Sequence, residues 1–427
     1  MAKVKPFYGL RYDTKKVGSL TAVTAPPYDI ISPEEQDALY KNHENNIINL
    51  EFGKIYDTDT DTNNRYTRAR ECLSDWMENG ILKFDEKPSY YIYEEIFEVN
   101  GETKHLRGIM SAVRLVPFSE KIVLPHEETL SKAKVDRFNL MTETEANFSP
   151  IYFLYMDEKK TVNKIMTEVC SKTPEETFTT ADGIVHNMWI VDDEETCKVI
   201  EESFNDKQLF IADGHHRYET ALKFSKTLPD NEKAQHVLAF SVEMDDPGLV
   251  VLPTHRIVKD IEDFDEAKVL DSLDNYFEIE KITCENASDD AEKVLSVNED
   301  IPSYAFYTGG DYFYLLKLKD TEVMKTILPD KSSAYCELDV SVLHTLILDK
   351  VFGIDMENMA NQKNLIYTKY ANDAVSSVKS GDANCSFLLN GTKVRQIKEV
   401  SLNNEKMPQK STYFYPKLIT GIVINKF

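Results

Sequence analysis

The sequence predicts a mixed α/β protein with more than one domain. Short apolar runs alternate with amphipathic stretches in the middle of the chain, which is typical of strands that alternate with helices. The 427 residues exceed what one ordinary core encloses, so two or three domains or subdomains are expected. The expected strands of this middle section cover residues 150–156, 187–191, 209–212 and 236–244, and the expected helices cover residues 161–172 and 218–228.

Start and stop signals predict further elements on both sides of this section. Ser32 is a good helix N-cap, because Pro33 follows it and Glu35 stands three residues after it. Asn100 and Gly101 form a typical hairpin turn between two apolar runs, 89–99 and 106–116. The remaining expected features are a helix over 65–79, a polar surface stretch at 285–294, a hairpin over 303–318, helices over 339–353, 372–381 and 392–404, a strand over 385–390, and a turn-rich segment at 405–418.

The charge and composition argue against several classes of partner. The formal net charge is −24 and no block rich in Lys or Arg is present, so neither nucleic acid nor an anionic membrane is expected as a main partner. No apolar run is long enough to span a bilayer, and the first residues lack the apolar core of a secretory signal. The six Cys residues are scattered, which indicates a cytoplasmic protein with reduced thiols and without structural zinc or disulfides. The sequence does not define an oligomeric state.

The stretch FIADGHHRYETALKF, residues 210–224, concentrates polar residues where an expected strand meets an expected helix. Gly214 permits the turn, and the N–H groups at the start of a helix favour an anion. Arg217 can contact phosphate or carboxylate through two hydrogen bonds, and His215 and His216 can donate to phosphate oxygens or move a proton. Asp213 can hold Mg²⁺ or orient a histidine. The alternatives are a capping turn in which Arg217 pairs with a nearby carboxylate, and a zinc site.

A second candidate site is VLPHEETLSKAKVDRFNL, residues 123–140. His126 and Glu127 follow a proline turn, and Lys134 and Arg137 come shortly after them. A carboxylate among cations can serve as a general base, so Glu127 is the candidate base and Lys134 and Arg137 are a candidate phosphate clamp. The alternative is a solvated loop with ordinary surface ion pairs.

The other candidates are substrate-binding residues on turns and at strand ends. A cation with two hydroxyl groups on an irregular segment suits a phosphate or an amino-acid head group. The alternatives are a surface loop, an edge strand rich in Tyr and Phe, or a rigid turn before a helix. The residues concerned are Lys410, Ser411 and Thr412 near the C-terminus, Tyr28 and Asp29 in APPYDII, and His255 at the end of an apolar strand.

Three of these motifs together resemble a known family. FIADGHHRYETAL resembles the phosphate-binding turn of the ParB/sulfiredoxin superfamily. The order Pro-His-Glu at 125–127, Asp-Gly-His-His-Arg at 213–217 and Pro-Gln-Lys-Ser-Thr at 408–412 is similar to that of the archaeal ADP-dependent free serine kinase. The PPYD, PHE, DGHHRYETA and KSTYFYPK stretches, which span nearly the full length, also resemble a large bacterial family known only as a domain of unknown function (DUF1015-like).

The resemblance implies a role for each motif. Glu127 matches the general base that acts on the serine hydroxyl. The turn at 213–217 would handle phosphate and Mg²⁺, with Asp213 as the metal ligand, and the segment at 410–412 would hold the amino acid or its phosphate. The chain departs from the kinase in several ways: it is longer, its first hundred residues have no counterpart, and Ser411 stands where the kinase has Thr.

The resemblance therefore implies a cytoplasmic phosphotransferase that acts on L-serine or O-phospho-L-serine, with ADP or ATP as co-substrate and Mg²⁺ as cofactor. The reverse direction would remove phosphate from O-phospho-L-serine in serine biosynthesis. The alternatives are a phosphoserine phosphatase that needs no nucleotide and a nucleotide-binding regulatory protein of the ParB type. The implied domains are an N-terminal α+β portion at 1–105, a ParB/sulfiredoxin-like core at 106–262 and a C-terminal α/β portion at 263–427 that completes the site.

Overall fold

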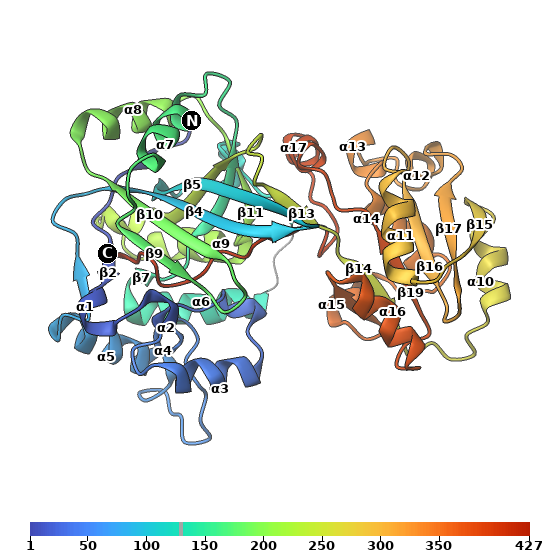
Figure 1. Cartoon of the computed structure of the whole chain (residues 1–427), viewed down its shortest axis with the longest axis horizontal. Coiled ribbons are helices and arrows are strands. Elements are labelled where there is room, and N and C mark those ends of the chain that lie inside the picture. The colour runs from blue at the N-terminus through green and yellow to red at the C-terminus, as the bar shows by residue number, and fades with distance from the viewer. Residues whose placement is uncertain (128–130) are drawn as a thin grey trace. The chain divides into compact units, whose positions relative to one another are not determined.

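The computed structural model describes residues 1–127 and 131–427 and confirms a mixed α/β protein (Figure 1). The chain divides into two compact units. Unit 1 comprises Met1–Pro125, the described part of Thr129–Leu249, and Pro416–Phe427. Unit 2 comprises the described part of His126–Glu128 together with Val250–Tyr415. The last residues of the chain therefore belong to the same unit as the first.

A mixed nine-stranded sheet forms the centre of unit 1. Only the pairs β6–β11 and β8–β12 among its described strands are parallel. Its strands, in spatial order, are β6 (Val123–Leu124), β11 (Leu209–Asp213), β8 (Ile151–Tyr155), β12 (His236–Glu243), β5 (Glu102–Arg114), β4 (Tyr90–Val99), β10 (Val185–Val191) and β9 (Glu176–Thr179), with β1 (Val4–Lys5) also paired to β5.

The helices of unit 1 bury one face of this sheet and extend beyond it. Apolar residues of α7, α8 and α9 pack on strand residues in one core cluster. Figure 1 shows α7 and α8 next to each other and α2, α3, α4 and α5 gathered in a separate group. The helices are α1 (Thr14–Val17), α2 (Leu20–Val23), α3 (Pro33–Asn42), α4 (Ile48–Glu51), α5 (Arg65–Glu78), α6 (Ser131–Thr144), α7 (Thr161–Cys170), α8 (Glu194–Phe204) and α9 (His215–Ser225), with 3₁₀ turns at Tyr28–Ile30, Phe118–Glu120 and Lys233–Gln235.

Two small antiparallel sheets complete unit 1. Strand β2 (Leu10–Tyr12) pairs with β3 (Leu82–Phe84). Strand β21 (Asn425–Lys426) pairs with β7 (Ala146–Asn147), so the C-terminal segment is hydrogen-bonded into this unit.

Unit 2 contains an antiparallel six-stranded sheet and a separate strand pair. The pair joins β13 (Val250–Leu252) to β20 (Tyr413–Tyr415). The six strands, in spatial order, are β15 (Phe277–Thr283), β17 (Tyr312–Leu318), β16 (Ser303–Tyr307), β19 (Cys385–Leu389), β14 (His255–Val258) and β18 (Leu365–Thr368). The helices are α10 (Glu266–Leu273), α11 (Ala287–Ser296), α12 (Glu322–Ile327), α13 (Ser333–Cys336), α14 (Asp339–Val342), the π-helix η4 (Leu343–Asp349), α15 (Met356–Asn361), α16 (Ala371–Lys379) and α17 (Val394–Leu402). No described helix is both long and apolar enough to cross a membrane.

Most of the expected elements are confirmed. The Ser32 hydroxyl accepts from the backbone N–H of Glu35, whose side chain accepts from the Ser32 N–H, so the predicted capping box is present. The hairpin around Asn100 and Gly101 pairs β4 with β5 along their length. The hairpin expected over 303–318 is β16 and β17.

Four expectations differ from the structure. Helix α9 begins at His215 and not near Tyr218, because Gly214 at φ 94° turns the chain directly into the helix. The polar stretch 285–294 belongs largely to α11, whose small and apolar residues Ala287, Ala291 and Leu295 are buried. Residues after Ser131, which the loop interpretation left unstructured, form α6. The implied boundary after residue 105 falls inside β5, and the two units divide after Leu249.

Candidate functional site

The Asp-Gly-His-His-Arg turn connects β11 to α9 in unit 1. Strand β11 ends at Asp213, and Gly214 occupies the left-handed region at φ 94°, where a residue with a Cβ would be strained. The N-cap residue of α9 is Gly214, which has no side chain to cap the helix. The first N–H groups of a helix have no partner within the helix and carry its positive dipole end. His215, His216 and Arg217 therefore form the first turn of α9, at a position that favours an anion.

Asp213 holds two cations beside this turn. Its Oδ2 accepts from Nη2 of Arg217 at 2.6 Å, and its Oδ1 accepts from Nζ of Lys417 at 2.6 Å. Arg217 also donates through Nη1 to the carbonyl oxygen of Pro150 at 2.6 Å. Burial raises the pKa of the Asp213 carboxyl, but Lys417 and Arg217 outweigh it and hold that pKa well below its usual range. Asp213 is therefore an ionised anchor that fixes both cations at the start of α9.

These contacts do not fit direct Mg²⁺ binding by Asp213. Each of its oxygens already accepts from a cationic side chain, and those cations would repel a metal ion at the same place. Among the described residues, no three His, Cys, Asp or Glu side chains gather into a metal-binding group. The Asp213–Arg217 pair is the contact expected in the alternative of a capping turn, and Asp213 holds Lys417 as well.

Arg137 and Lys134 of α6 make ion pairs within unit 1. Arg137 is buried, and its guanidinium lies 3.2 Å from Oε1 of Glu51, contacts Asp136 at 2.5 Å and stacks on the ring of Tyr28 at 3.9 Å. Lys134 donates to Glu219 of α9 at 2.8 Å. Carboxylates of the chain itself therefore engage both candidate clamp cations.

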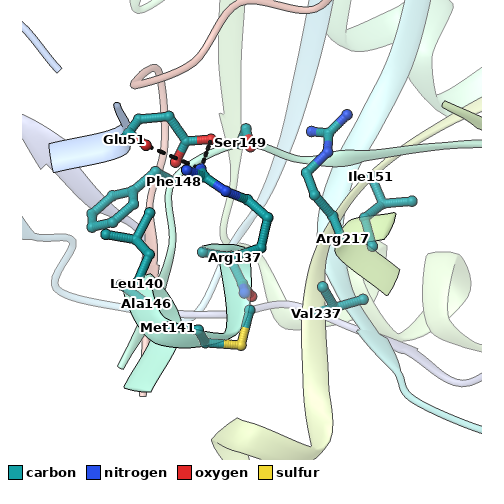
Figure 2. Close-up of a pocket in the computed structure, with 11 residues that line it drawn as sticks. Glu51, Arg137, Leu140, Met141, Ala146, Phe148, Ser149, Ile151, Arg217 and Val237 are labelled. Atoms are coloured by element: carbon teal, nitrogen blue, oxygen red, sulfur yellow. Dashed lines mark hydrogen bonds and ion pairs between the residues drawn. The ribbon is translucent and has the colours of Figure 1, made fainter. Parts of the chain in front are cut away.

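A small pocket lies beside Arg137. Figure 2 shows Arg137 turned toward Glu51 and Ser149, with Arg217 on another side of the pocket. Its volume is about 30 Å³, which has room for roughly one or two water molecules but not for a phosphorylated substrate. Tyr28 and Asp29 form the 3₁₀ turn at Tyr28–Ile30, and the Tyr28 ring packs on Arg137.

The Pro-His-Glu motif contacts the 407–412 segment in unit 2. Glu127 forms a parallel bridge with Met407, and the Met407 N–H donates to the carbonyl oxygen of His126 at 2.8 Å. Nε2 of His126 lies 3.0 Å from Oγ1 of Thr412, and the Lys410 N–H donates to Oε1 of Glu127 at 3.5 Å. Two motifs separated by 283 to 286 residues at these contacts thus form one cluster in unit 2.

The remaining predicted residues of unit 2 are held by internal hydrogen bonds. Ser411 is buried, and its hydroxyl donates to the carbonyl oxygen of Pro408 at 2.5 Å. His255 is 1% exposed, and its Nδ1 accepts from the Leu389 N–H at 3.3 Å. Burial lowers the pKa of His255 to about 4, so the ring is neutral at physiological pH. His255 is therefore the first residue of β14 and is buried there, not open to solvent.

Two further residues contribute to these clusters: Lys417, which the sequence did not single out, and Arg256, which the sequence indicated as a candidate beside His255 at a strand end. Lys417 contacts Asp213 from 204 residues away in the sequence, and no local spacing indicates such a pairing. Arg256 is fully buried and donates to the carbonyl oxygen of Lys410 at 3.1 Å, which fixes the 407–412 segment from behind. The only available signal was the placement of Lys417 and Arg256 next to the motifs already singled out.

Comparison with known proteins identifies the family. The family model described as "Protein of unknown function (DUF1015)" matches residues 4–341, and the chain belongs to that family. No curated protein matches the sequence.

Several solved structures resemble the chain at low identity. A free serine kinase variant in complex with ADP is 14% identical, with a TM-score of 0.35 over 72% of this chain and 87% of that chain. A conserved hypothetical protein from Pyrococcus furiosus is 16% identical, with a TM-score of 0.32 over 72% of this chain and 90% of the other. SbnI from Staphylococcus aureus, with a C-terminal truncation, is 10% identical, with a TM-score of 0.32 over 72% and 84%.

Proposed function

We propose that the chain is a phosphotransferase that moves a phosphoryl group between a nucleotide and L-serine, or in reverse from O-phospho-L-serine. The observation that supports the proposal best is the pair of cations, Arg217 and Lys417, that Asp213 holds at the N-terminus of α9. A phosphoryl group in transfer carries charge on its peripheral oxygens, and prearranged N–H donors and cations stabilise that charge. In the proposed reaction, this turn binds the phosphate.

Asp213 has a positioning role in this proposal. Two cations that face one anion site repel each other, and a carboxylate that contacts both allows them to stay close. Arg217 is also fixed by the carbonyl oxygen of Pro150, so its planar group is held in one orientation before a substrate arrives. Fixed donors lose little rotational freedom on binding, which favours the charged transition state.

Glu127 is the proposed general base. In the kinase direction its carboxylate would accept the serine hydroxyl proton as the serine oxygen attacks phosphorus and the nucleotide leaves. In the reverse direction the protonated carboxyl would return that proton to the serine oxygen as the O–P bond breaks. Two observations support this role: the contact between Glu127 and the Lys410 N–H, and the bridge that places Glu127 beside Met407.

Lys410, Ser411 and Thr412 are the proposed substrate-binding segment. Lys410 has an exposed side chain and a backbone φ of 56°, a conformation that is uncommon for a residue other than glycine. Thr412 contacts His126, so the hydroxyl of one motif is tied to the imidazole of the other. His126 is proposed to orient Thr412.

Glu127→Gln tests the proposal, with Glu262→Gln as the matched control. Glu262 is an exposed carboxylate of the same unit, so its replacement leaves the candidate site intact. Loss of a general base typically lowers the rate about 10²- to 10⁴-fold. We expect that loss in kcat for Glu127→Gln in both directions, with normal turnover for Glu262→Gln. Full turnover by Glu127→Gln would rule out the base assignment.

A second pair of variants tests the phosphate-binding turn. Arg217→Met removes the planar cation, and Lys223→Met removes a lysine from the last turn of α9, away from the turn at 213–217. We expect Arg217→Met to raise KM for O-phospho-L-serine more than tenfold and to lower kcat, because bidentate contacts to phosphate are among the stronger hydrogen bonds. Lys223→Met is expected to behave as the unmodified chain does.

A further inference from the structure

Unit 2 contains a large cavity that the roles proposed above do not use. Its volume is about 570 Å³, within the range of roughly 300–1,000 Å³ that is usual for small-molecule sites. The π-helix η4, helix α15 and the segment before Lys410 contribute to its walls. Six of its lining residues are Leu328, Tyr335, His344, Thr345, Met359 and Met407.

The π-helix brings two polar side chains to this cavity. His344 and Thr345 are adjacent in sequence and both line it. A π-helix is rare, and single π turns inside helices occur frequently at functional sites because they shift side chains off the regular helical positions. The wall mixes apolar side chains, among them Leu328, Tyr335 and Met359, with charged ones: Lys331, Lys350, Lys406, Asp349, Asp355 and Glu357. The cavity therefore offers a ligand both apolar surface and polar or charged groups.

Arg256 fixes the protonation of His344. The guanidinium donates through Nη2 and Nε to Nε2 of His344 at 3.1 and 3.3 Å, so this nitrogen accepts and Nδ1 carries the proton. Burial, together with the charge of Arg256, holds the pKa of His344 well below its usual value, and the ring stays neutral. His344 is thus a neutral ring with one defined donor, Nδ1–H, in the wall of the cavity.

The cavity adjoins the Glu127 cluster within unit 2. Met407 lines the cavity and also forms the bridge to Glu127. Pro408 and Gln409 continue the wall, and Lys410 follows them directly. A ligand in this cavity would therefore be separated from the candidate base by a single segment of chain. Serine is far too small to fill the volume, so the cavity suits the larger partner in the reaction.

We propose that this cavity binds the nucleoside part of the nucleotide co-substrate, an inference that rests on the phosphotransferase function proposed above. A flat heteroaromatic base packs well against Tyr335 and the methionine side chains. A ring nitrogen of the base accepts from Nδ1–H of His344, and the hydroxyl of Thr345 contacts the base or the ribose.

Protection of a methionine tests the proposal without any substitution. Met356 lines the cavity and is 76% exposed, so dilute peroxide oxidises it readily. We expect adenosine, added to the full chain, to slow oxidation of Met356 severalfold, as measured by mass spectrometry. Met156 of unit 1 is 36% exposed and lies outside this cavity, so its oxidation rate is the internal control. Equal rates for Met356 with and without adenosine would overturn the proposal.

Calorimetric titration of adenosine gives a second, independent test. Tyr335→Ala removes the aromatic wall and is expected to weaken adenosine binding about tenfold. Leu402→Ala, on the exposed part of α17 and outside the cavity, is expected to bind adenosine normally. Unchanged affinity for adenosine in Tyr335→Ala would count against nucleoside binding in this cavity. Because adenosine carries no phosphate, its binding is measured whether or not the chain transfers phosphate, so failure of the proposed function and failure of this site are distinguishable.

Discussion

Glu95 of unit 1 allows a quantitative test of how burial in the interior changes the pKa of a carboxyl group. It is completely buried in β4, and burial raises the pKa of its carboxyl to about 8 from an ordinary value of 4.5. Tyr93 Oη lies 3.1 Å from Oε1 of Glu95 and 2.6 Å from Nδ1 of His186. Nε2 of His186 lies 2.9 Å from the hydroxyl of Thr180, which donates to the carbonyl oxygen of Ile184.

A protonated Glu95 together with a neutral His186 satisfies every hydrogen bond of this series. The carboxyl then donates to Tyr93, Tyr93 donates to His186, and His186 donates to Thr180. An ionised Glu95 beside a neutral His186 would reverse the direction, and the single hydroxyl proton of Thr180 would have to serve two acceptors. The raised pKa of Glu95 and the lowered pKa of His186 favour the neutral pair over an ionised Glu95 beside a protonated His186 at pH 7.

Glu95→Gln should make the free energy of unfolding less dependent on pH. A group whose folded pKa is raised contributes its full stability below the unfolded pKa, here 4.5, and loses it as the pH rises toward 8. Between pH 5 and pH 7 this loss amounts to about 3 kcal/mol, since one pKa unit corresponds to about 1.4 kcal/mol. Gln cannot ionise and still donates to Tyr93, so the variant should not lose this contribution.

Urea denaturation at pH 5, 6, 7 and 8 measures the effect. Glu98→Gln, an exposed carboxylate on the same strand, is the control and should follow the unmodified chain. The pKa of His186, lowered to about 4 by burial, makes the folded state less stable as the pH falls below 6.5. The contribution of His186 is the same in the unmodified chain and in Glu98→Gln, and it is small in all three proteins at pH 7 and 8, where His186 is neutral. Parallel pH profiles for Glu95→Gln and the unmodified chain would refute the assignment of a neutral, buried Glu95.

Two further substitutions test contacts in unit 1. Asp213→Asn leaves Arg217 and Lys417 without their shared carboxylate. We therefore expect urea titration to show a loss of about 3 kcal/mol in the free energy of unfolding. A loss below about 1 kcal/mol would contradict the pairing. Gly108→Ala places a Cβ 2.5 Å from the ring of Phe240. We therefore expect a lower melting temperature and a loss of about 2 kcal/mol in the free energy of unfolding. An unchanged melting temperature would show that the strands tolerate the methyl group.

Local patterns predicted most elements of the fold but not the division into units. The Ser32 cap and the Asn100–Gly101 turn depend on neighbouring residues alone, and both are present. The division depends on long-range pairing, because the chain leaves unit 1 after Leu249 and returns at Pro416. No local sequence signal near Leu249 or Pro416 indicates that the chain returns to unit 1. The expected domain boundaries were therefore placed by the positions of the motifs and differ from the division into units.

The sequence indicated the separate motifs of the candidate site better than the contacts between them. The polar turn at 213–217 was evident from residue types and from Gly214. The start of α9 was placed too late because the three polar residues after Gly214 lack the apolar spacing of a helix. The contact between Asp213 and Lys417 depends on the docking of the C-terminal segment, which no local pattern indicates.

The most direct test of the proposed phosphotransferase activity is an assay of the full chain with O-phospho-L-serine and Mg²⁺. The assay is run with ADP, with AMP and without nucleotide, and it is repeated with L-serine in place of O-phospho-L-serine. We expect turnover that requires a nucleotide and is lost in Glu127→Gln. Phosphate release of equal rate without any nucleotide would instead identify a phosphoserine phosphatase. Absence of turnover in every combination would contradict the proposed phosphotransferase.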